Sequence, residues 1–171
     1  MGRIRTFAIA AFFFVTAMSG IAQQLLTIPE QTDYTQTSRL ADVMAFFSQL
    51  QKANPERVVL DSIGQSLEGR PIPLIILGNP APVKPEQSGK PVVLLVGNIH
   101  AGEVEGKEAL QMLARDLLRQ PDSPILDACS ILMVPVFNPD GNEQIDPKHR
   151  AYQQVSGGVG TRTNALNMDL N

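Results

Sequence analysis

The sequence predicts an α/β fold in which helices flank a mixed, mostly parallel central sheet. The first observation is a strand–helix–strand succession. Two short apolar runs, Val92–Val96 and residues 131–136, enclose an amphipathic stretch over residues 103–119, and such a unit forms a right-handed crossover with parallel strands. The second observation is a pair of aliphatic runs, residues 57–63 and 72–77, around a glycine-containing turn, which predicts an antiparallel hairpin. Together they indicate one layered domain.

A helix is the first element that the sequence predicts. Apolar residues recur at helical spacing from Leu40 to Leu50, directly after Thr37 and Ser38. Asn54 precedes a proline, and a residue in that position disfavours helical backbone. We therefore expect the helix to end there and to lead into the hairpin.

The crossover unit carries the strongest periodic signals. Val92–Val96 is wholly apolar, which is typical of a strand buried on both faces of a sheet. Residues 103–119 place leucines on one face and charges on the other, as an amphipathic helix does. The run 131–136 reads as a second buried strand, in which Pro135 requires an edge, a bulge or the end of the strand.

The composition is that of an ordinary globular protein. The 171 residues are 43% hydrophobic and 18% charged, with 14 basic and 17 acidic side chains and a net charge of −3. These values exclude collagen, a coiled coil and a disordered polar tail, and they give no electrostatic case for a nucleic-acid partner. The single cysteine, Cys129, excludes an internal disulfide, and we expect it to be a small buried hydrophobe.

Residues 1–22 are predicted to be a cleaved signal peptide. A basic start precedes the apolar run 7–18, and Gly20 and Ala22 stand at positions −3 and −1 of a cleavage site. The alternative is a membrane anchor, but the run is shorter than the roughly 20 apolar residues that a spanning helix needs. The sequence therefore predicts a secreted or periplasmic protein with no stable membrane anchor after cleavage.

Candidate ligands follow the first crossover strand, at the edge of the sheet where ligands usually bind. His100 stands at the strand exit and Glu103 at the helix start, in the spacing H-x-x-E. Imidazole and carboxylate groups are both zinc ligands, and the turn can bring the two together. The alternative is a loop histidine beside a glutamate that favours the positive end of the helix dipole. The spacing alone is a weak signal.

Two further polar residues, Asp140 and Arg162, have two readings each. Asp140 belongs to an Asn-Pro-Asp-Gly turn sequence, or it supports a zinc-bound histidine through a hydrogen bond. Arg162 is a solvated surface arginine, or it binds a carboxylate or a developing oxyanion. His149 lies in a Pro-Lys-His-Arg stretch and is expected to be a solvated loop histidine.

Four stretches in this order resemble the zinc carboxypeptidase family, the carboxypeptidase A-like metallopeptidases. The resemblance runs from about Ser38 to Asn171 and implies a mixed sheet between helices, one Zn²⁺ ion, and hydrolysis of C-terminal residues from a peptide substrate. The four stretches are residues 63–70 (IGQSLEGR), 97–103 (GNIHAGE), 138–141 (NPDG) and 169–171 (DLN).

The resemblance implies roles for individual residues. His100 and Glu103 match the family's first two zinc ligands. Arg162 matches the arginine that polarises the scissile carbonyl and is thus a catalytic and substrate-binding residue. Asn171 matches the asparagine that helps to hold the terminal carboxylate of the substrate.

The sequence also departs from the family pattern. Members carry an arginine directly after the position of Asn171, a third zinc-binding histidine and a general-base glutamate, and none of these three has a counterpart here. Gly102 stands where the best-known members carry an arginine. We therefore expect residues 38–171, after a lead segment over residues 23–37, to be the amino-terminal part of a catalytic domain. The fold would be incomplete at its C-terminus, and the chain alone would bind zinc weakly and be inactive.

Two other functions stay open. Deacylases of N-acyl amino acids share the H-x-x-E spacing on a related scaffold, and a non-catalytic binding module could keep the fold without the chemistry. The sequence does not predict an oligomeric state.

Overall fold

The protein is described by a computed structural model over residues 25–152 and 156–171. The signal peptide predicted for residues 1–22 lies outside these residues. No helix within them has the length and apolar character needed to cross a membrane. The strands are β1 (Val58–Gln65), β2 (Pro71–Leu77), β3 (Val92–Val96) and β4 (Ser130–Val134). The helices are α2 (Ile28–Gln31), α3 (Leu40–Ala53), α4 (Glu105–Arg119), α5 (Pro124–Ala128) and α6 (Pro139–Glu143), with a 3-10 turn, η1, at Pro85–Gln87.

The four described strands form one mixed sheet in the order β1-β2-β4-β3. The hairpin β1–β2 and the neighbours β2–β4 are antiparallel, whereas β3 and β4 are parallel. The mixed α/β architecture, the antiparallel hairpin and the parallel crossover through α4 are thus confirmed. The expected majority of parallel pairs is not found within the described residues, because the hairpin supplies the second neighbour of β4. Pro135 falls just beyond the end of β4, one of the places predicted for it.

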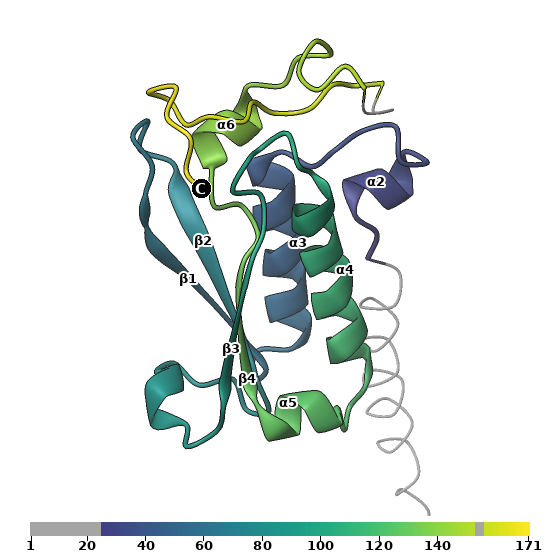
Figure 1. The fold of residues 1–171 in the computed structure, drawn as a ribbon. Helices are drawn as coiled ribbons and strands as arrows, with labels where there is room; N and C mark the ends of the chain where they lie inside the picture. Colours follow the sequence, from purple (N-terminus) through teal and green to yellow (C-terminus); the bar gives the residue numbers. More distant parts are fainter. Residues whose placement is uncertain (1–24, 153–155) are drawn as a thin grey trace, which may run out of the picture.

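Helices α3 and α4 lie side by side on one face of the sheet (Figure 1). Alternate side chains of a strand point to opposite faces, so one residue in two reaches the helices. Ile75 of β2 pairs with Met133 of β4, and Met133 pairs with Leu95 of β3. This row packs with Phe47 of α3 and Ala114 of α4 in the hydrophobic core. Cys129 packs against the same core but is only half-buried, so the expectation that it is buried holds in part.

Strand β3 is not buried on both faces, and that prediction is wrong. Leu94 is 59% exposed, and Val92, Val93 and Val96 are exposed as well. Only Leu95 packs against the core. The physical reason is position: β3 is the last strand at one edge of the described sheet, and α3 and α4 cover only the face on which Leu95 lies. A wholly apolar run reveals the apolar character of a strand but not its place in the sheet.

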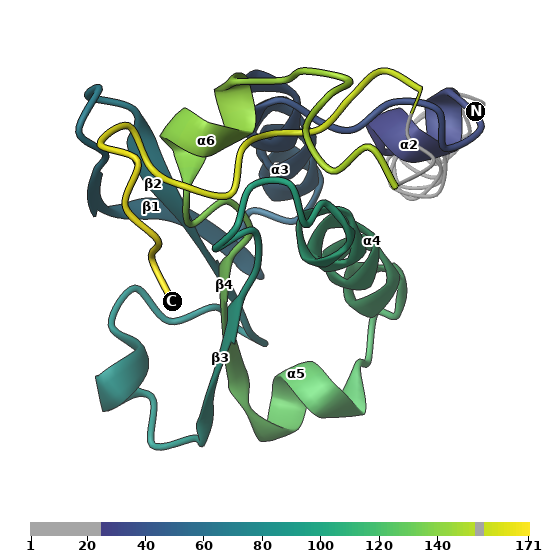
Figure 2. The same cartoon turned by 45° about the horizontal axis from the view of Figure 1, so that its top comes forward.

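The polar segment after β4 forms a short helix, α6, where the sequence indicated only a turn. Pro139 occupies its first turn, and the Asn138 side chain caps it by accepting a hydrogen bond of 3.0 Å from the Gly141 amide. The C-terminal segment runs past α6 above the ends of the strands (Figure 2). The strand exits, α6 and the C-terminal segment therefore meet at one end of the sheet.

A buried polar network joins α4 to the neighbouring elements at this end. Lys107 is fully buried and donates hydrogen bonds to the Ser38 carbonyl and, over 2.6 Å, to Asn142 Oδ1. Burial lowers the pKa of Lys107 to about 8. Glu108 accepts hydrogen bonds from the Thr37 hydroxyl and the Ser38 amide, each over 2.7 Å. These hydrogen bonds hold the segment before α3 against α4 and α6, in addition to the apolar contacts of the core.

Candidate metal-binding site at the carboxyl ends of the strands

The turn that carries His100 and Glu103 leaves β3 through two constrained positions. Gly97 lies against α4, since a Cβ there would come within 3.0 Å of the Gly106 carbonyl carbon. Asn98 follows with a φ of 57°, in the left-handed region that asparagine tolerates better than most residues. Its buried side-chain amide donates to the carbonyls of Ala101 and Glu103 over 3.2 and 3.1 Å. These two hydrogen bonds stabilise the turn that carries His100 and Glu103.

His100 and Glu103 face each other across this turn. The distance from His100 Nδ1 to Glu103 Oε1 is 3.1 Å. The imidazole is nearly buried, with 7% of its side chain exposed, whereas 47% of the Glu103 side chain is exposed. Glu103 precedes α4, which begins at Glu105. The two groups therefore converge with one side open to solvent.

The other nitrogen of the His100 ring has a carboxylate partner that sequence reasoning missed. Asp169 Oδ1 lies 2.9 Å from His100 Nε2. The hydrogen bonds from His100 and then Arg162 lower the pKa of Asp169 to about 2, so it is a carboxylate at neutral pH. Asp169 stands in the stretch DLN that carries part of the family resemblance, and this was the signal that could have found it.

Arg162 and Asn171 both reach the site through Asp169. Arg162 Nε donates to Asp169 Oδ2 over 2.9 Å, and the Asn171 backbone amide donates to Asp169 Oδ1 over 3.1 Å. The structure thus brings all four predicted site residues to one end of the sheet.

Of the two readings of Asp140, the structure does not bear out the one in which it supports the zinc-bound histidine. Asp140 is buried and accepts hydrogen bonds from the Ser66 hydroxyl over 2.6 Å and from Arg70 over 2.7 Å, as well as from the Glu68 amide. Burial acts to raise the pKa of Asp140, but these donors outweigh it and the pKa is lowered. Asp140 therefore fastens the β1–β2 turn to α6, and Asp169 holds His100 instead.

Arg150 is the second residue of the site that the sequence did not reveal. Its Nη2 donates to Glu103 Oε1 over 2.7 Å. Burial acts to raise the pKa of Glu103, but the hydrogen bonds from Arg150 and His100 prevail and lower it. Glu103 is therefore an anion at neutral pH. The neighbouring His149 is turned elsewhere, with its Nδ1 lying 3.2 Å from the Val159 carbonyl.

The donor set fits two positions of a zinc site. Catalytic zinc takes nitrogen and oxygen ligands from histidine and carboxylate side chains, and a zinc-binding histidine commonly gives its other ring nitrogen to a carboxylate. Here His100 supplies the nitrogen ligand and Glu103 the oxygen ligand, and Asp169 is the carboxylate partner of the other ring nitrogen of His100. Within residues 25–152 and 156–171, no three or more His, Cys, Asp or Glu side chains form a group that could hold a metal ion.

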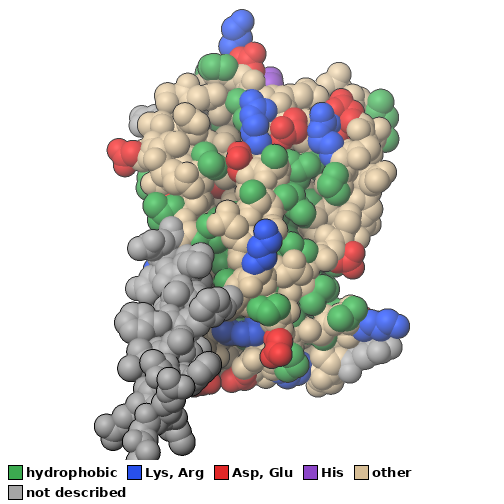
Figure 3. Space-filling view, turned by 180° about the vertical axis from the view of Figure 1, so that it is seen from behind, with side chains coloured by type: hydrophobic (Ala, Val, Ile, Leu, Met, Phe, Trp, Pro, Cys, Tyr) green, Lys and Arg blue, Asp and Glu red, His purple; other side chains and the backbone are tan. Residues whose placement is uncertain are grey.

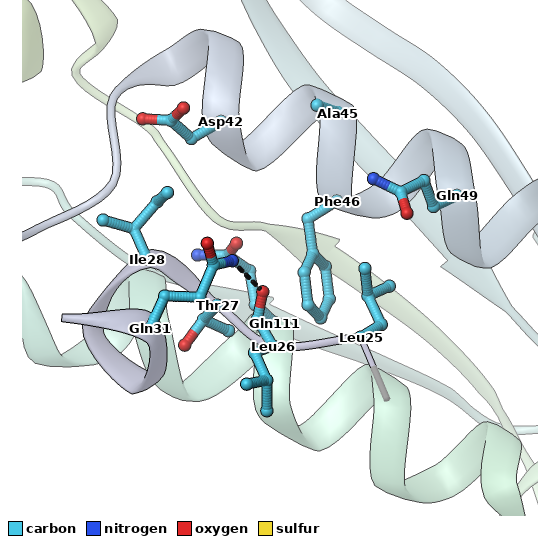
Figure 4. A pocket seen from close by; sticks show the side chains of 10 residues that line it. All are labelled: Leu25, Leu26, Thr27, Ile28, Gln31, Asp42, Ala45, Phe46, Gln49 and Gln111. Carbon is cyan, nitrogen blue, oxygen red and sulfur yellow. Dashed lines mark hydrogen bonds between the residues drawn. The ribbon is translucent and has the colours of Figure 1, made fainter. Parts of the chain in front are cut away.

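An open hollow lies beside Glu103 and Arg150, with Gly97, Asn98 and Ile99 in its wall. A second hollow lies between α2 and α3, where Gln31 donates to the Leu26 carbonyl over 2.7 Å (Figure 4). The second hollow contains none of the predicted site residues, so we place the candidate chemistry at Glu103.

On the face opposite that of Figure 1, charges of both signs lie interspersed among apolar and polar side chains (Figure 3).

Two solved structures with the same fold are carboxypeptidases. A metallo-carboxypeptidase from Burkholderia cenocepacia has a TM-score of 0.56 and 26% identity, over 79% of this chain and 32% of that one. The carboxypeptidase A of Helicoverpa armigera has a TM-score of 0.60 over 88% of this chain and 36% of that one; at 21% identity, this likeness concerns the fold.

Sequence relatives agree with the structural ones. Carboxypeptidase E of Caenorhabditis elegans is 35% identical over 141 residues, which are 77% of this chain and 28% of that protein. Human carboxypeptidase Z is 38% identical over 116 residues, 64% of this chain and 17% of that protein. A protein of Ajellomyces dermatitidis that is named an inactive metallocarboxypeptidase is 35% identical over 94 residues, 51% of this chain and 15% of its own length. This chain thus spans less than a third of the length of these relatives.

The family model described as zinc carboxypeptidase matches residues 43–171. That range contains β1 to β4, α4, α6 and all the residues that surround His100. On this match and the relatives above, the chain belongs to the zinc carboxypeptidase family.

Proposed function

We propose that residues 38–171 are part of the catalytic domain of a zinc-dependent carboxypeptidase that removes C-terminal amino acids from peptides. The observation that carries this proposal is the convergence of His100 Nδ1 on Glu103 Oε1 while Asp169 engages the opposite ring nitrogen. Family membership supports the reaction class. The protein would act outside the cytoplasm, in the periplasm or the medium, if residues 1–22 direct its export as their sequence predicts.

In this proposal His100 and Glu103 are two protein ligands of one zinc ion. When bound, zinc lowers the pKa of a coordinated water to about 7 and polarises a carbonyl group. Asp169 is proposed to accept a hydrogen bond from the Nε2–H of His100, which leaves Nδ1 as the electron-pair donor to the metal. The third ligand and the general base expected from the family resemblance stay predictions.

Arg162 and Asn171 are proposed to bind the substrate. The Arg162 guanidinium is half-exposed at the rim of the site and is oriented by Asp169. A guanidinium in this position stabilises the oxyanion that develops on the scissile carbonyl, an effect worth about 3–4 kcal/mol in comparable sites. Asn171 would hold the terminal carboxylate of the peptide, which gives the enzyme its preference for chain ends.

Zinc titration of the metal-free full chain tests the proposal. We expect one weak zinc site per chain, loss of binding in His100→Gln, and unchanged binding in His149→Gln, because His149 Nδ1 is engaged with the Val159 carbonyl. The measurement is the shift of the histidine ring signals in NMR spectra as Zn²⁺ is added. Zinc binding that survives His100→Gln would contradict the proposed ligand.

Hydrolysis of a blocked dipeptide distinguishes the remaining alternatives. We expect negligible turnover by this chain alone, since only two protein ligands are proposed here. Chelator-sensitive release of a C-terminal amino acid would overturn the expectation of inactivity and establish the peptidase. Release of acyl groups from N-acyl amino acids instead would favour a deacylase. Zinc binding without either activity, in a chain that also supplies a third ligand and a general base, would favour a binding module.

A further inference from the structure

The side chain of Arg150 lies directly over the α-carbon of Gly102. A Cβ at Gly102 would come within 2.8 Å of Arg150 Nε and 2.9 Å of Arg150 Cδ. The arginine thus occupies space that a side chain at residue 102 would need, and the Gly160 carbonyl oxygen, 2.9 Å from the same Cβ position, restricts that space further. The backbone of Arg150 adopts a φ of 47°, a conformation that is uncommon for a bulky residue and frequent near functional sites.

This path takes the guanidinium to the proposed metal ligand. Arg150 Nη2 lies 2.7 Å from Glu103 Oε1, the same oxygen that faces His100 Nδ1. Arg150 Nη1 also donates to the Tyr152 hydroxyl over 3.2 Å. The arginine side chain is 18% exposed, so the ion pair is partly shielded from water.

One carboxylate oxygen cannot serve a guanidinium and a divalent cation equally well. A cation between His100 Nδ1 and Glu103 Oε1 draws on the electron pairs that Arg150 now uses. It also brings two positive charges close to the positive charge of Arg150, and like charges at such short range repel each other even in water. Metal entry therefore works against the Arg150–Glu103 contact.

We propose that Arg150 is a built-in competitor of the metal ion at Glu103. It neutralises Glu103 while no metal is bound, and it must give up or shift this contact when the metal binds. The inference rests on the proposed function, because it takes His100 and Glu103 as metal ligands. It adds a residue, Arg150, that sets the affinity of the site for the metal ion.

The direction in which zinc affinity changes when Arg150 is replaced distinguishes a competitor of the metal from a residue that supports Glu103. A residue that merely positions Glu103 would weaken metal binding when it is removed. A competitor would strengthen it. We expect Arg150→Gln to bind Zn²⁺ about 5- to 10-fold more tightly than the wild type, since both the ion pair and the repulsion are removed. Arg150→Lys keeps the charge but loses the planar fork, so its affinity is expected to lie between the two.

The experiment is a Zn²⁺ titration of the metal-free full chain, followed by competition with a chromophoric chelator and by the His100 ring signals. Arg39→Gln is the matched control: it removes the same charge from a residue that pairs with Glu143, outside the site, and is expected to match the wild type. Circular dichroism spectra establish that each variant is folded.

Each outcome has a distinct meaning. Equal or weaker zinc affinity in Arg150→Gln, with wild-type binding that depends on His100, would overturn the competition and leave the metal site standing. Equal tightening in Arg39→Gln would show a general charge effect and would also overturn it. Absence of zinc binding in the wild type and all variants would overturn the proposed function and this inference together.

Discussion

Asn98 shows how much a single residue contributes to the geometry of the site. Its side-chain amide donates to two carbonyls of the turn that carries His100 and Glu103, whereas its buried Oδ1 has no hydrogen-bond partner among the residues that the structure describes. Both side-chain hydrogen bonds by which Asn98 stabilises the turn are therefore donated by its Nδ2 atom. Its left-handed backbone adds a second constraint, because asparagine and glycine adopt this conformation at low cost.

The prediction at this scale concerns Asn98→Ala. The change leaves the Ala101 and Glu103 carbonyls without their donor and places a less tolerant residue at a φ of 57°. We expect a loss of about 2 kcal/mol in the free energy of unfolding, measured by urea denaturation. Asn98→Gly is the control that loses the hydrogen bonds but keeps the backbone unstrained, and it should cost less. An unchanged midpoint in Asn98→Ala would show that the turn does not need this brace.

The choice between Asp140 and Asp169 is also made at the residue scale. Both are aspartates, and either could support a histidine by its chemistry. Asp169 is 69 positions from His100 along the chain and reaches it only through the return of the C-terminal segment. Local sequence cannot determine such a contact, but the family stretch that contains Asp169 could have suggested it.

At the scale of secondary-structure elements, the short helix α2 is fastened to α4 by one ion pair. Arg115 of α4 donates to both carboxylate oxygens of Glu30 over 2.6 and 2.8 Å, and Glu30 also accepts from the Thr27 amide over 2.8 Å. The side chains of Arg115 and Glu30 are largely buried. Hydrogen bonds from Arg115 are the main cause that lowers the pKa of Glu30 from 4.5 to about 2.

This pair makes stability depend on pH in a defined window. Because the pKa of Glu30 is lower in the folded state, its contribution is complete above about pH 4.5 and is lost as the pH falls toward 2. We expect Glu30→Gln to lower the free energy of unfolding by about 1–2 kcal/mol at pH 7, with the difference shrinking below pH 4.5. Urea denaturation at several pH values measures it.

Asp116→Asn is the matched control for Glu30→Gln. Asp116 also contacts Arg115, over 3.4 Å, but 55% of its side chain is exposed. We expect a change below about 0.5 kcal/mol at every pH. A pH-independent difference between wild type and Glu30→Gln would show that the Glu30 charge is not the source of the stabilisation.

At the scale of the whole molecule, the edge strand β3 presents an apolar surface. Leu94 pairs with Leu132 of β4, and Leu132 pairs with Ile76 of β2. This row lies on the face of the sheet that α3 and α4 do not cover, and Leu94 is its exposed end. Exposed apolar edge strands favour association with other strands.

Replacing Leu94 tests this property. We expect Leu94→Lys to reduce self-association, measured by light scattering during concentration, while changing the free energy of unfolding by less than about 0.5 kcal/mol. Leu95→Lys is the matched control one position away: Leu95 packs against the core, so a charge there should destabilise the fold by more than about 2 kcal/mol. Unchanged scattering in a folded Leu94→Lys would contradict the assignment of this edge.

The sequence predicted those elements whose pattern is local and long. The helix α3, the hairpin and the crossover helix α4 follow from periodic apolar residues and from the residues that end them. Helices α2 and α5 have four and five residues, too few to show a helical period, and they were not predicted. For α6, the turn sequence around Asp140 was identified but its helical continuation was not.

By itself, the sequence determined the mixed α/β fold and the spacing of His100 and Glu103, because both depend on residues close together in the chain. Only the tertiary structure decided that β3 lies at the edge of the described sheet, that Asp169 rather than Asp140 holds His100, and that Arg150 reaches Glu103. These features join segments that are distant in sequence, and their contacts depend on how the C-terminal part of the chain returns over the strand ends.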